Sequence, residues 1–265
     1  MKKYSLFAAV LLTSILYGCT VVPITGRKQM NLLPESDLIS MGLTSYQEFL
    51  KENRLSSDKT NASIVREVGI KIATAVQQFF ADNKMQSRLN GYQWEFSLVD
   101  SKEANAFCLP GGKVVVYTGL LPYTVDRSGL AVVISHEIAH AVARHGNERM
   151  SQEILIQLGG MALSQAVKNK PEQTRNIFLS AYGMGSQVGV LLPYSREHEL
   201  EADKLGLIFM AMAGFNPETS IRFWERMSSS GGAKPPEFLS THPSDAARIN
   251  NIKANMPEIM KYYKK

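Results

Sequence analysis

Cysteine is scarce in this chain: its 265 residues contain only Cys19 and Cys108. We expect Cys19 to be modified, for the reason given below, and the one remaining cysteine cannot form an intrachain disulfide. This excludes a disulfide framework, even if the protein works in an oxidising compartment. The fold must therefore be stabilised by packing, with a bound metal as a further source of stability.

Long apolar runs are missing after the first 18 residues. A transmembrane helix needs about 20 consecutive apolar residues. Polar residues interrupt the two most apolar stretches, 154–167 and 177–192. We therefore expect packing helices there and no membrane-spanning segment.

Clusters of one charge are missing as well. The net charge of +5 comes from lysines and arginines that are spread along the chain, which argues against a nucleic-acid partner. The chain shows no internal repeat, and its content of 45% hydrophobic and 20% charged residues is typical of a globular protein. These features predict one folded domain.

The N-terminus has the pattern of a lipoprotein signal. Lys2 and Lys3 precede an apolar run over residues 6–17, and the small Gly18 stands directly before Cys19. That run is short for a membrane span and is typical of a signal sequence. We predict cleavage before Cys19 and lipidation of its side chain. An ordinary secretory signal is the alternative.

This pattern divides the chain into three parts. Residues 1–18 are the predicted signal peptide, 19–34 the lipidated cysteine with a tether, and 35–265 a single domain. Thr20, rather than an aspartate, follows the cysteine. We therefore expect an anchor on the periplasmic face of the outer membrane, with a Gram-positive anchor left open.

Hydrophobic periodicity predicts an α+β domain that is mainly helical, with a small sheet. Residues 105–121 contain a Pro-Gly-Gly turn before a β-branched run, which indicates a hairpin. The remaining expected elements are helices over 35–50 and 62–80, a strand within 92–100, and nearly continuous helices from 128 onward.

Three of the five histidines lie within residues 131–148. The surrounding positions are apolar on nearly every face, which predicts a buried helix. His136 and His140 are one turn apart on the same face, so both imidazoles can reach one metal ion. Glu137 lies off that line and can address a metal-bound water, as in a helical zinc peptidase. The alternative is a pair of core histidines bonded to backbone carbonyls.

A third ligand is needed for a catalytic zinc site. His145 is a poor candidate, because it stands five and not six residues past His140 and no glycine intervenes between them to break the helix. On a continuing helix His145 points away from His140, as a surface or second-layer residue. Glu199 on a later predicted helix is the better candidate, with Asp203 one turn on to orient a ligand histidine. Glu201 faces another side of that helix. A solvated acidic face is the alternative for this stretch.

Four segments together resemble a known family, the membrane-associated gluzincin zinc metallopeptidases that include HtpX, the CAAX prenyl proteases and the Oma-type proteases. The resemblance is closest to single-domain bacterial envelope lipoprotein members. It implies a zincin-like domain with a sheet edge strand beside the active-site cleft. The segments are NAFCLPGGKVVVYTGLL, AVVISHEIAHAVARH, LLPYSREHELEADKLGL and FLSTHPSDAARI.

The resemblance implies one Zn²⁺ per chain, with His136, His140 and Glu199 as its ligands. It makes Glu137 the general base and Asp203 the partner of a ligand histidine.

The resemblance also implies that the segment from Asn105 to Gly112 aligns the substrate as an added strand. It places His242 near the active site, where His242 either hydrogen-bonds the tetrahedral intermediate or occupies the water position on zinc. A simple loop residue is the alternative. Arg196 and Arg248 are weaker candidates for orienting carboxylates or substrate, and Cys108 is interpreted as a small packing residue.

These observations predict a zinc endopeptidase of the cell envelope that hydrolyses misfolded or unassembled envelope proteins. The expected partners are protein or peptide substrates, the membrane through the lipid anchor, and envelope assembly or chaperone proteins. A latent or non-catalytic zinc-binding chaperone or scaffold lipoprotein is the alternative. The intact Glu137 favours the enzyme, because a structural zinc site needs no general base.

Overall fold

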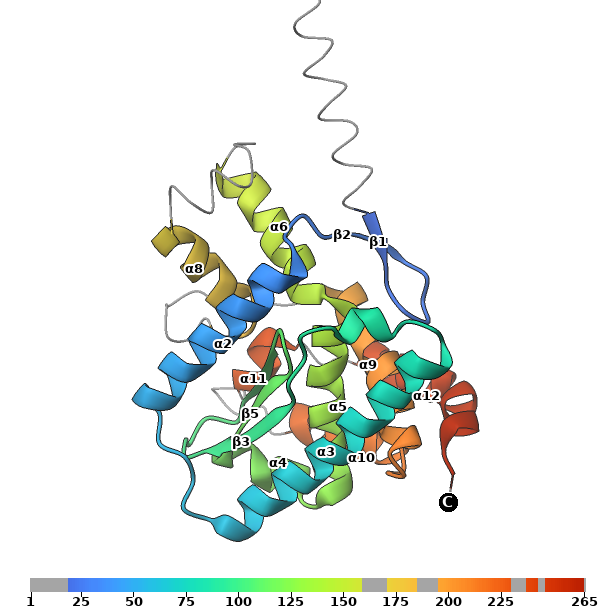
Figure 1. Cartoon of the computed structure of the whole chain (residues 1–265). Helices are drawn as coiled ribbons and strands as arrows, with labels where there is room; N and C mark the ends of the chain where they lie inside the picture. The colour runs from blue at the N-terminus through green and yellow to red at the C-terminus, as the bar shows by residue number, and fades with distance from the viewer. Residues whose placement is uncertain (1–18, 159–170, 185–194, 230–236, 243–245, 265) are drawn as a thin grey trace, which may run out of the picture.

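The computed structural model describes residues 19–158, 171–184, 195–229, 237–242 and 246–264 (Figure 1). The helices are α2 Glu35–Glu52, α3 Lys59–Asp82, α4 Leu121–Thr124, α5 Arg127–Ala143, α6 His145–Leu158, α8 Pro171–Ala181, α9 Arg196–Met212, α10 Thr219–Ser229, α11 Glu237–Thr241 and α12 Ala246–Ile259. The strands are β1 Cys19–Val21, β2 Lys28–Met30, β3 Glu95–Val99, β4 Ala106–Leu109 and β5 Lys113–Tyr117. This confirms the expected fold class. Within the described residues, no helix combines the length and apolar character needed to cross a bilayer.

The larger sheet has the strand order β3-β5-β4. The predicted hairpin is confirmed, since β4 and β5 pair antiparallel with Phe107 opposite Val115. Its turn contains Gly111 and Gly112, both at a φ of 85°, a region that favours glycine. Strand β3 pairs parallel to β5, which the sequence pattern did not predict. Strand β4 is therefore an edge strand of this sheet, as β3 is on the other side, and β4 packs against α5.

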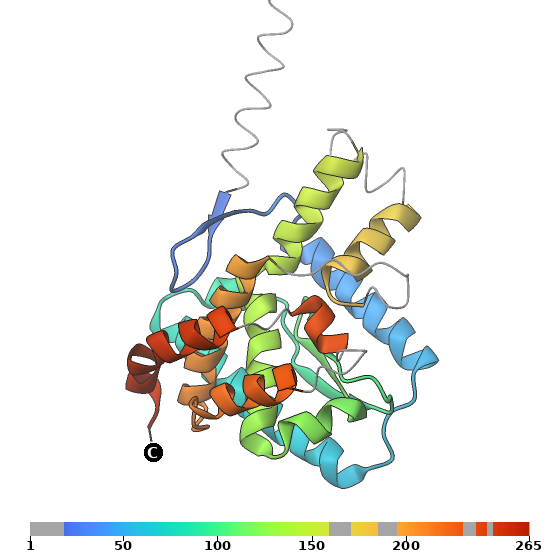
Figure 2. The same cartoon turned by 180° about the vertical axis from the view of Figure 1, so that it is seen from behind.

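Helix α5 is the central element of the fold. It is buried along almost its whole length, and α3, α9, α10 and β4 pack around it. The side chains of β5 alternate between two cores: Val114 and Val116 face the core around α5, whereas Val115 and Tyr117 face a second core that includes α2 and α8 residues. Figure 2, from the opposite side, brings the C-terminal helices α10 and α12 (orange to red) to the front.

Close packing of α9 on α5 depends on a glycine. A Cβ atom at Gly206 would lie 2.9 Å from the backbone oxygen of Ser135 and 3.0 Å from the backbone nitrogen of His136. A side chain there would push the helices apart. Gly206 therefore lets α9 approach α5 beside the histidine pair.

The N-terminal segment differs from the expected tether. Strands β1 and β2 form an antiparallel hairpin, seen beside α9 and α6 in Figure 1. Val22 is only 1% exposed, and the Gln29 side-chain amide donates to the backbone oxygen of Ala143. Burial of apolar side chains and ion pairs of Arg27 with Glu148 and Glu201 hold the segment on the domain. The predicted signal at 1–18 lies outside the described residues.

Candidate metal centre

The two predicted ligand histidines of α5 face each other. Asp126 begins the helix by accepting a hydrogen bond from the backbone nitrogen of Gly129. His136 and His140 follow on one face, each 2% exposed, with 3.0 Å between their Nε2 atoms. Two imidazole nitrogens are thus aimed at one point, as the spacing of one helical turn requires.

Helix α9 places a carboxylate beside this pair. Ser195 begins α9 by accepting a hydrogen bond from the backbone nitrogen of His198. The Glu199 carboxylate lies 3.3 Å from His140 Nε2 through Oε1 and 3.4 Å from His136 Nε2 through Oε2. The structure therefore brings together the three residues predicted as ligands.

His242 joins the same cluster. It follows α11, and its Nδ1 atom lies 3.0 Å from Glu199 Oε1 and 3.2 Å from His136 Nε2. One ligand atom from each of His136, His140, Glu199 and His242 lies within 4.8 Å of the others, and all four side chains are buried.

The donor set fits a zinc ion. Imidazole nitrogens and a carboxylate are ligands that Zn²⁺ prefers, and their converging lone pairs need a cation in so buried a place. Glu137 lies at the edge of the cluster, where its buried Oε1 atom has no hydrogen-bond partner within the described residues and lies 3.4 Å from His242 Nε2. Burial raises the pKa of Glu137, which favours a role as proton acceptor near neutral pH.

Asp203, which is predicted to orient a ligand histidine, contacts His136. Its Oδ1 atom lies 3.0 Å from His136 Nδ1. Arg248 of α12 donates to both carboxylate oxygens of Asp203, at 2.7 and 2.8 Å, and lies 2.6 Å from Glu199 Oε2. The guanidinium also stacks on Trp224, 3.6 Å from the ring centroid. Arg248, a weaker candidate in the sequence, is thus a buried counter-charge for two site carboxylates.

Burial and neighbouring charges oppose each other at these groups. Burial alone would raise the pKa of Glu199, but His242, Arg248 and His136 outweigh it and hold the pKa well below the usual range. Burial would likewise lower the pKa of His136, yet Glu199 and Asp203 raise it to about 9. Both pKa shifts have the same cause: the ionised carboxylates are stabilised by positive charge close to them.

The structure corrects the expected direction of His145. The side chain is fully buried, and its Nδ1 atom lies 3.0 Å from His140 Nδ1. Helix α5 ends before Arg144, which adopts the left-handed conformation at φ 65° and pairs with Glu35 at 3.2 Å. The chain therefore turns without a glycine and directs His145 back toward His140. No local sequence signal marks this turn.

Glu201 is also buried rather than solvated. As expected, it lies on another side of α9 and is not part of the metal cluster. Its Oε2 atom is 3.3 Å from His145 Nε2. The acidic stretch of α9 therefore contributes three buried carboxylates, Glu199, Glu201 and Asp203, and the alternative of a solvated acidic face is wrong for them.

The predicted substrate segment lies along β4. Asn105 stands just before the strand and accepts a hydrogen bond from the backbone nitrogen of Ala106 through its side chain. The backbone nitrogen of Phe238 in α11 donates to the oxygen of Ala104, which connects this end of β4 to the His242 segment. Gly112 occupies the turn at the far end of the hairpin. Substrate binding at Asn105 and Gly112 stays a prediction.

The remaining candidates, Cys108 and Arg196, are not among the residues of the metal cluster. Cys108 of β4 is buried in the core around α5, in agreement with a packing role. Arg196 is exposed at the first position of α9.

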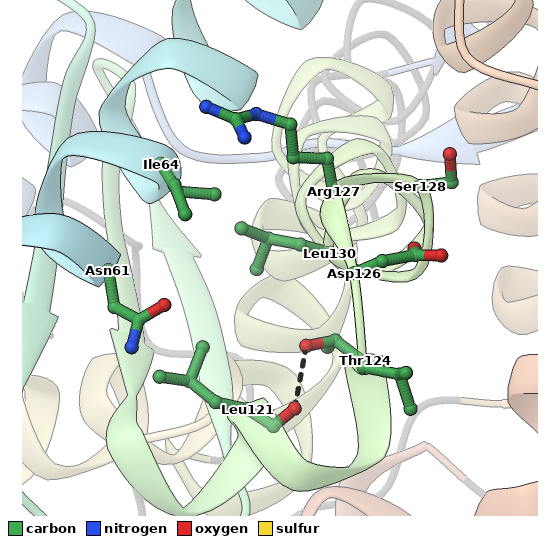
Figure 3. Close-up of a pocket in the computed structure, with 9 residues that line it drawn as sticks. Asn61, Ile64, Leu121, Thr124, Asp126, Arg127, Ser128 and Leu130 are labelled. Carbon is green, nitrogen blue, oxygen red and sulfur yellow. Dashed lines mark hydrogen bonds between the residues drawn. The ribbon is translucent and has the colours of Figure 1, made fainter.

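A surface pocket near the start of α5 is a separate feature (Figure 3). It is lined by Asn61, Ile64, Leu121, Thr124, Val125, Asp126, Arg127, Ser128 and Leu130. Its charged side chains already have structural partners: Asp126 caps α5 through Gly129, and Arg127 pairs with Glu67 at 2.7 Å. We assign no chemistry to this pocket.

Comparison with known proteins decides the family. Residues 71–256 match Peptidase family M48. The chain belongs to this family. The resemblance to Oma-type zinc metallopeptidases that the four sequence segments indicated is thereby confirmed.

Individual relatives match different shares of the M48 chain. It is 34% identical over 242 residues to mitochondrial metalloendopeptidase OMA1 of Schizosaccharomyces pombe, covering 89% of this chain and 66% of that protein. It is 30% identical over 247 residues to the human mitochondrial metalloendopeptidase OMA1, covering 91% and 46%. It is 30% identical over 162 residues to the beta-barrel assembly-enhancing protease of Escherichia coli, covering 59% and 33%. The chain spans less than two thirds of the length of each.

Proposed function

We propose that this M48 protein is a zinc-dependent endopeptidase with one Zn²⁺ per chain. The observation that carries the proposal is the buried cluster of His136, His140 and Glu199 with Glu137 beside it. A zinc site with three protein ligands and a neighbouring general base is the arrangement of a catalytic centre. The metalloendopeptidase relatives support the same function.

Different residues of the chain have different roles in peptide hydrolysis. Zn²⁺, when bound, supplies the Lewis acidity that polarises the scissile carbonyl and makes a water easier to deprotonate. Glu137 accepts the proton of the attacking water and later delivers it to the leaving amine. Asp203 and Arg248 hold His136 and Glu199 in place. Strand β4, from Asn105 toward the turn at Gly112, aligns the peptide by pairing with its backbone.

We further propose that His242 holds the site latent. Its imidazole lies within the ligand cluster and 3.4 Å from the Glu137 carboxylate, where the attacking water has to stand. The same segment bonds to Ala104 next to β4 through Phe238, so it competes with substrate for both positions. Movement of His242 away from the cluster would open the site.

A non-catalytic zinc-binding scaffold or chaperone is the second candidate. The observation in its favour is the fourth possible ligand, since structural zinc sites close their fourth position with protein. Glu137 distinguishes the two functions, because only the enzyme needs a base there.

The test compares purified residues 19–265 with Glu137→Gln and His242→Ala variants. We expect one zinc per chain in all three, casein cleavage reduced about 10²–10⁴-fold by Glu137→Gln, and increased by His242→Ala. Zinc in every protein with no cleavage in any would favour the scaffold. Reduced cleavage in His242→Ala would instead assign His242 to stabilising the reaction, and unchanged cleavage would reject both roles.

We place the protein in the cell envelope, anchored by lipid at Cys19 on the periplasmic face of the outer membrane. Residues 1–18 would be the signal peptide and 35–265 one peptidase domain. Misfolded or unassembled envelope proteins are the proposed substrates, with assembly or chaperone proteins as further partners. The similarity to a beta-barrel assembly-enhancing protease supports this setting. Metabolic labelling with palmitate of wild type beside Cys19→Ala tests the anchor.

A further inference from the structure

A second set of buried polar residues lies behind the metal cluster. His145 contacts His140 at 3.0 Å between Nδ1 atoms, and His145 Nε2 lies 3.3 Å from Glu201 Oε2. His140 lies on α5, His145 begins α6 and Glu201 lies on α9. None of the catalytic steps above uses His145 or Glu201, although both are buried. Burying polar side chains costs free energy, so we expect these two residues to have a function.

The N-terminal hairpin completes this set. Arg27 Nε donates to Glu201 Oε2 at 2.6 Å, and the Thr25 hydroxyl contacts the other oxygen of the same carboxylate. The two terminal nitrogens of Arg27 donate to the carboxylate of Glu148 at 3.0 and 2.8 Å. One guanidinium is therefore shared as a counter-charge by two buried carboxylates, from α6 and α9.

His198 packs the set from its other side. Its Nε2 atom lies 2.9 Å from Glu148 Oε2, and its ring stacks on that of His145, with 4.5 Å between centroids and an interplanar angle of 17°. The stacking and the ion pairs restrict the His145 ring to one orientation. His145 is thus held in a fixed position, although it is not one of the proposed metal ligands.

The positions of the protons follow from the contacts. The Nε2 atom of His140 faces the metal cluster, so the proton of its neutral ring is on Nδ1. That proton is donated to His145 Nδ1, which leaves the proton of His145 on Nε2, facing Glu201. One tautomer of each ring is thus consistent with the 3.0 Å contact between the two Nδ1 atoms and directs the His145 Nε2 proton toward Glu201 Oε2, 3.3 Å away.

We propose that His145, Glu201 and Arg27 are positioning residues for the ligand His140, so that the N-terminal hairpin is a working part of the metal site. The inference rests on the proposed zinc function. It means that displacement of the hairpin, which begins at Cys19, loosens His140 and weakens metal binding, although the hairpin contributes no ligand.

Zinc affinity, measured by competition with a chromophoric chelator, tests this proposal on residues 19–265. Removal of a partner behind a ligand typically weakens metal binding about 10–100-fold. We expect a loss in that range for His145→Leu, and recovery to near wild type for His145→Gln, whose amide oxygen accepts the His140 proton. Arg27→Met should lower affinity by about tenfold. Lys28→Met, which removes an exposed charge from the same hairpin, is the matched control.

The absorption spectrum of the Co²⁺-loaded chain gives a second readout, because a shift in the visible bands of His145→Leu reports a change in ligand geometry that loss of stability alone would not cause. Wild-type affinity in both His145→Leu and Arg27→Met would overturn the inference and leave the zinc function intact. A folded wild type that binds no zinc would overturn both. If His145→Leu does not fold, Arg27→Met decides, since its side chain is partly exposed and tolerates replacement better.

Discussion

The two proposed ligand histidines of α5, His136 and His140, are supported in different ways. Behind His136 stands a carboxylate, Asp203, held by Arg248, whose side chain is 3% exposed. Behind His140 stands an imidazole, His145, and only then a carboxylate, which is held by Arg27 with 17% of its side chain exposed. A carboxylate in direct contact raises the basicity of a ligand histidine more than a neutral ring does. The support of His136 is therefore the stronger of the two. The support of His140 is the longer one, because it runs through an additional residue.

The origin of the two supports differs as well. Arg248 comes from α12 at the C-terminal end, whereas Arg27 comes from the hairpin at the N-terminal end. Helix α9 supplies the carboxylates of both, from opposite sides. One support is internal to the folded domain, and the other reaches the segment nearest to the proposed membrane anchor. This difference makes the His140 side the better candidate for transmitting an outside event to the metal.

Replacement of Arg248 removes the stronger support, and we expect it to have the largest effect of the changes proposed here. In Arg248→Met, two buried carboxylates, Asp203 and Glu199, lose their counter-charge, which typically costs about 3–5 kcal/mol of unfolding free energy. Denaturant unfolding of the zinc-free chain measures this loss. Zinc should reduce it, because the metal itself then compensates Glu199. Arg27→Met serves as the comparison and should cost less, since solvent screens a partly exposed guanidinium. Equal losses would show that the two supports do not differ.

Variants of the two supports should also differ in zinc affinity, although this effect is smaller. Asp203→Asn retains the shape of the side chain but removes the charge that faces both His136 and Arg248. We expect a loss near the upper end of the usual range, about 100-fold, against a loss nearer the lower end for His145→Leu. Chelator competition measures both under the same conditions. A greater loss in His145→Leu would reverse the assignment of the stronger side.

The sequence predicted the stronger support and missed the longer one, for a physical reason. His136 and His140, and likewise Glu199 and Asp203, are four positions apart, so periodicity places each pair on one face of its own helix. His145 depends on a left-handed turn at Arg144, a conformation that only glycine or asparagine would have signalled.

Long-range pairing was equally invisible in the sequence. The partners of Arg27 lie 121 and 174 positions further along the chain, so the local sequence pattern, which lacks helical periodicity, predicts only a tether there. The parallel pairing of β3 with β5 likewise depends on tertiary packing and not on any local pattern. Local rules thus predicted the helices and strands and the residues that cluster as proposed ligands, whereas contacts between distant segments determined which side chains lie behind them.

Low pH should weaken the contacts that hold the N-terminal hairpin on the domain, and this is the smallest effect we expect. Burial alone would raise the pKa of Glu148, but its contacts with His198 and Arg27 outweigh burial and lower the pKa from 4.5 to about 2. A carboxylate with a depressed pKa stabilises the fold above its ordinary pKa, and this contribution is lost as the pH falls through the folded value. The stability difference between the zinc-free wild type and Glu148→Gln should therefore be full above pH 4.5 and should shrink toward about pH 2. Denaturant unfolding at several pH values measures it, with Glu225→Gln, at a side chain 53% exposed on α10, as the control. A difference that stays constant over this range would mean that the hairpin is not held through the ionised Glu148.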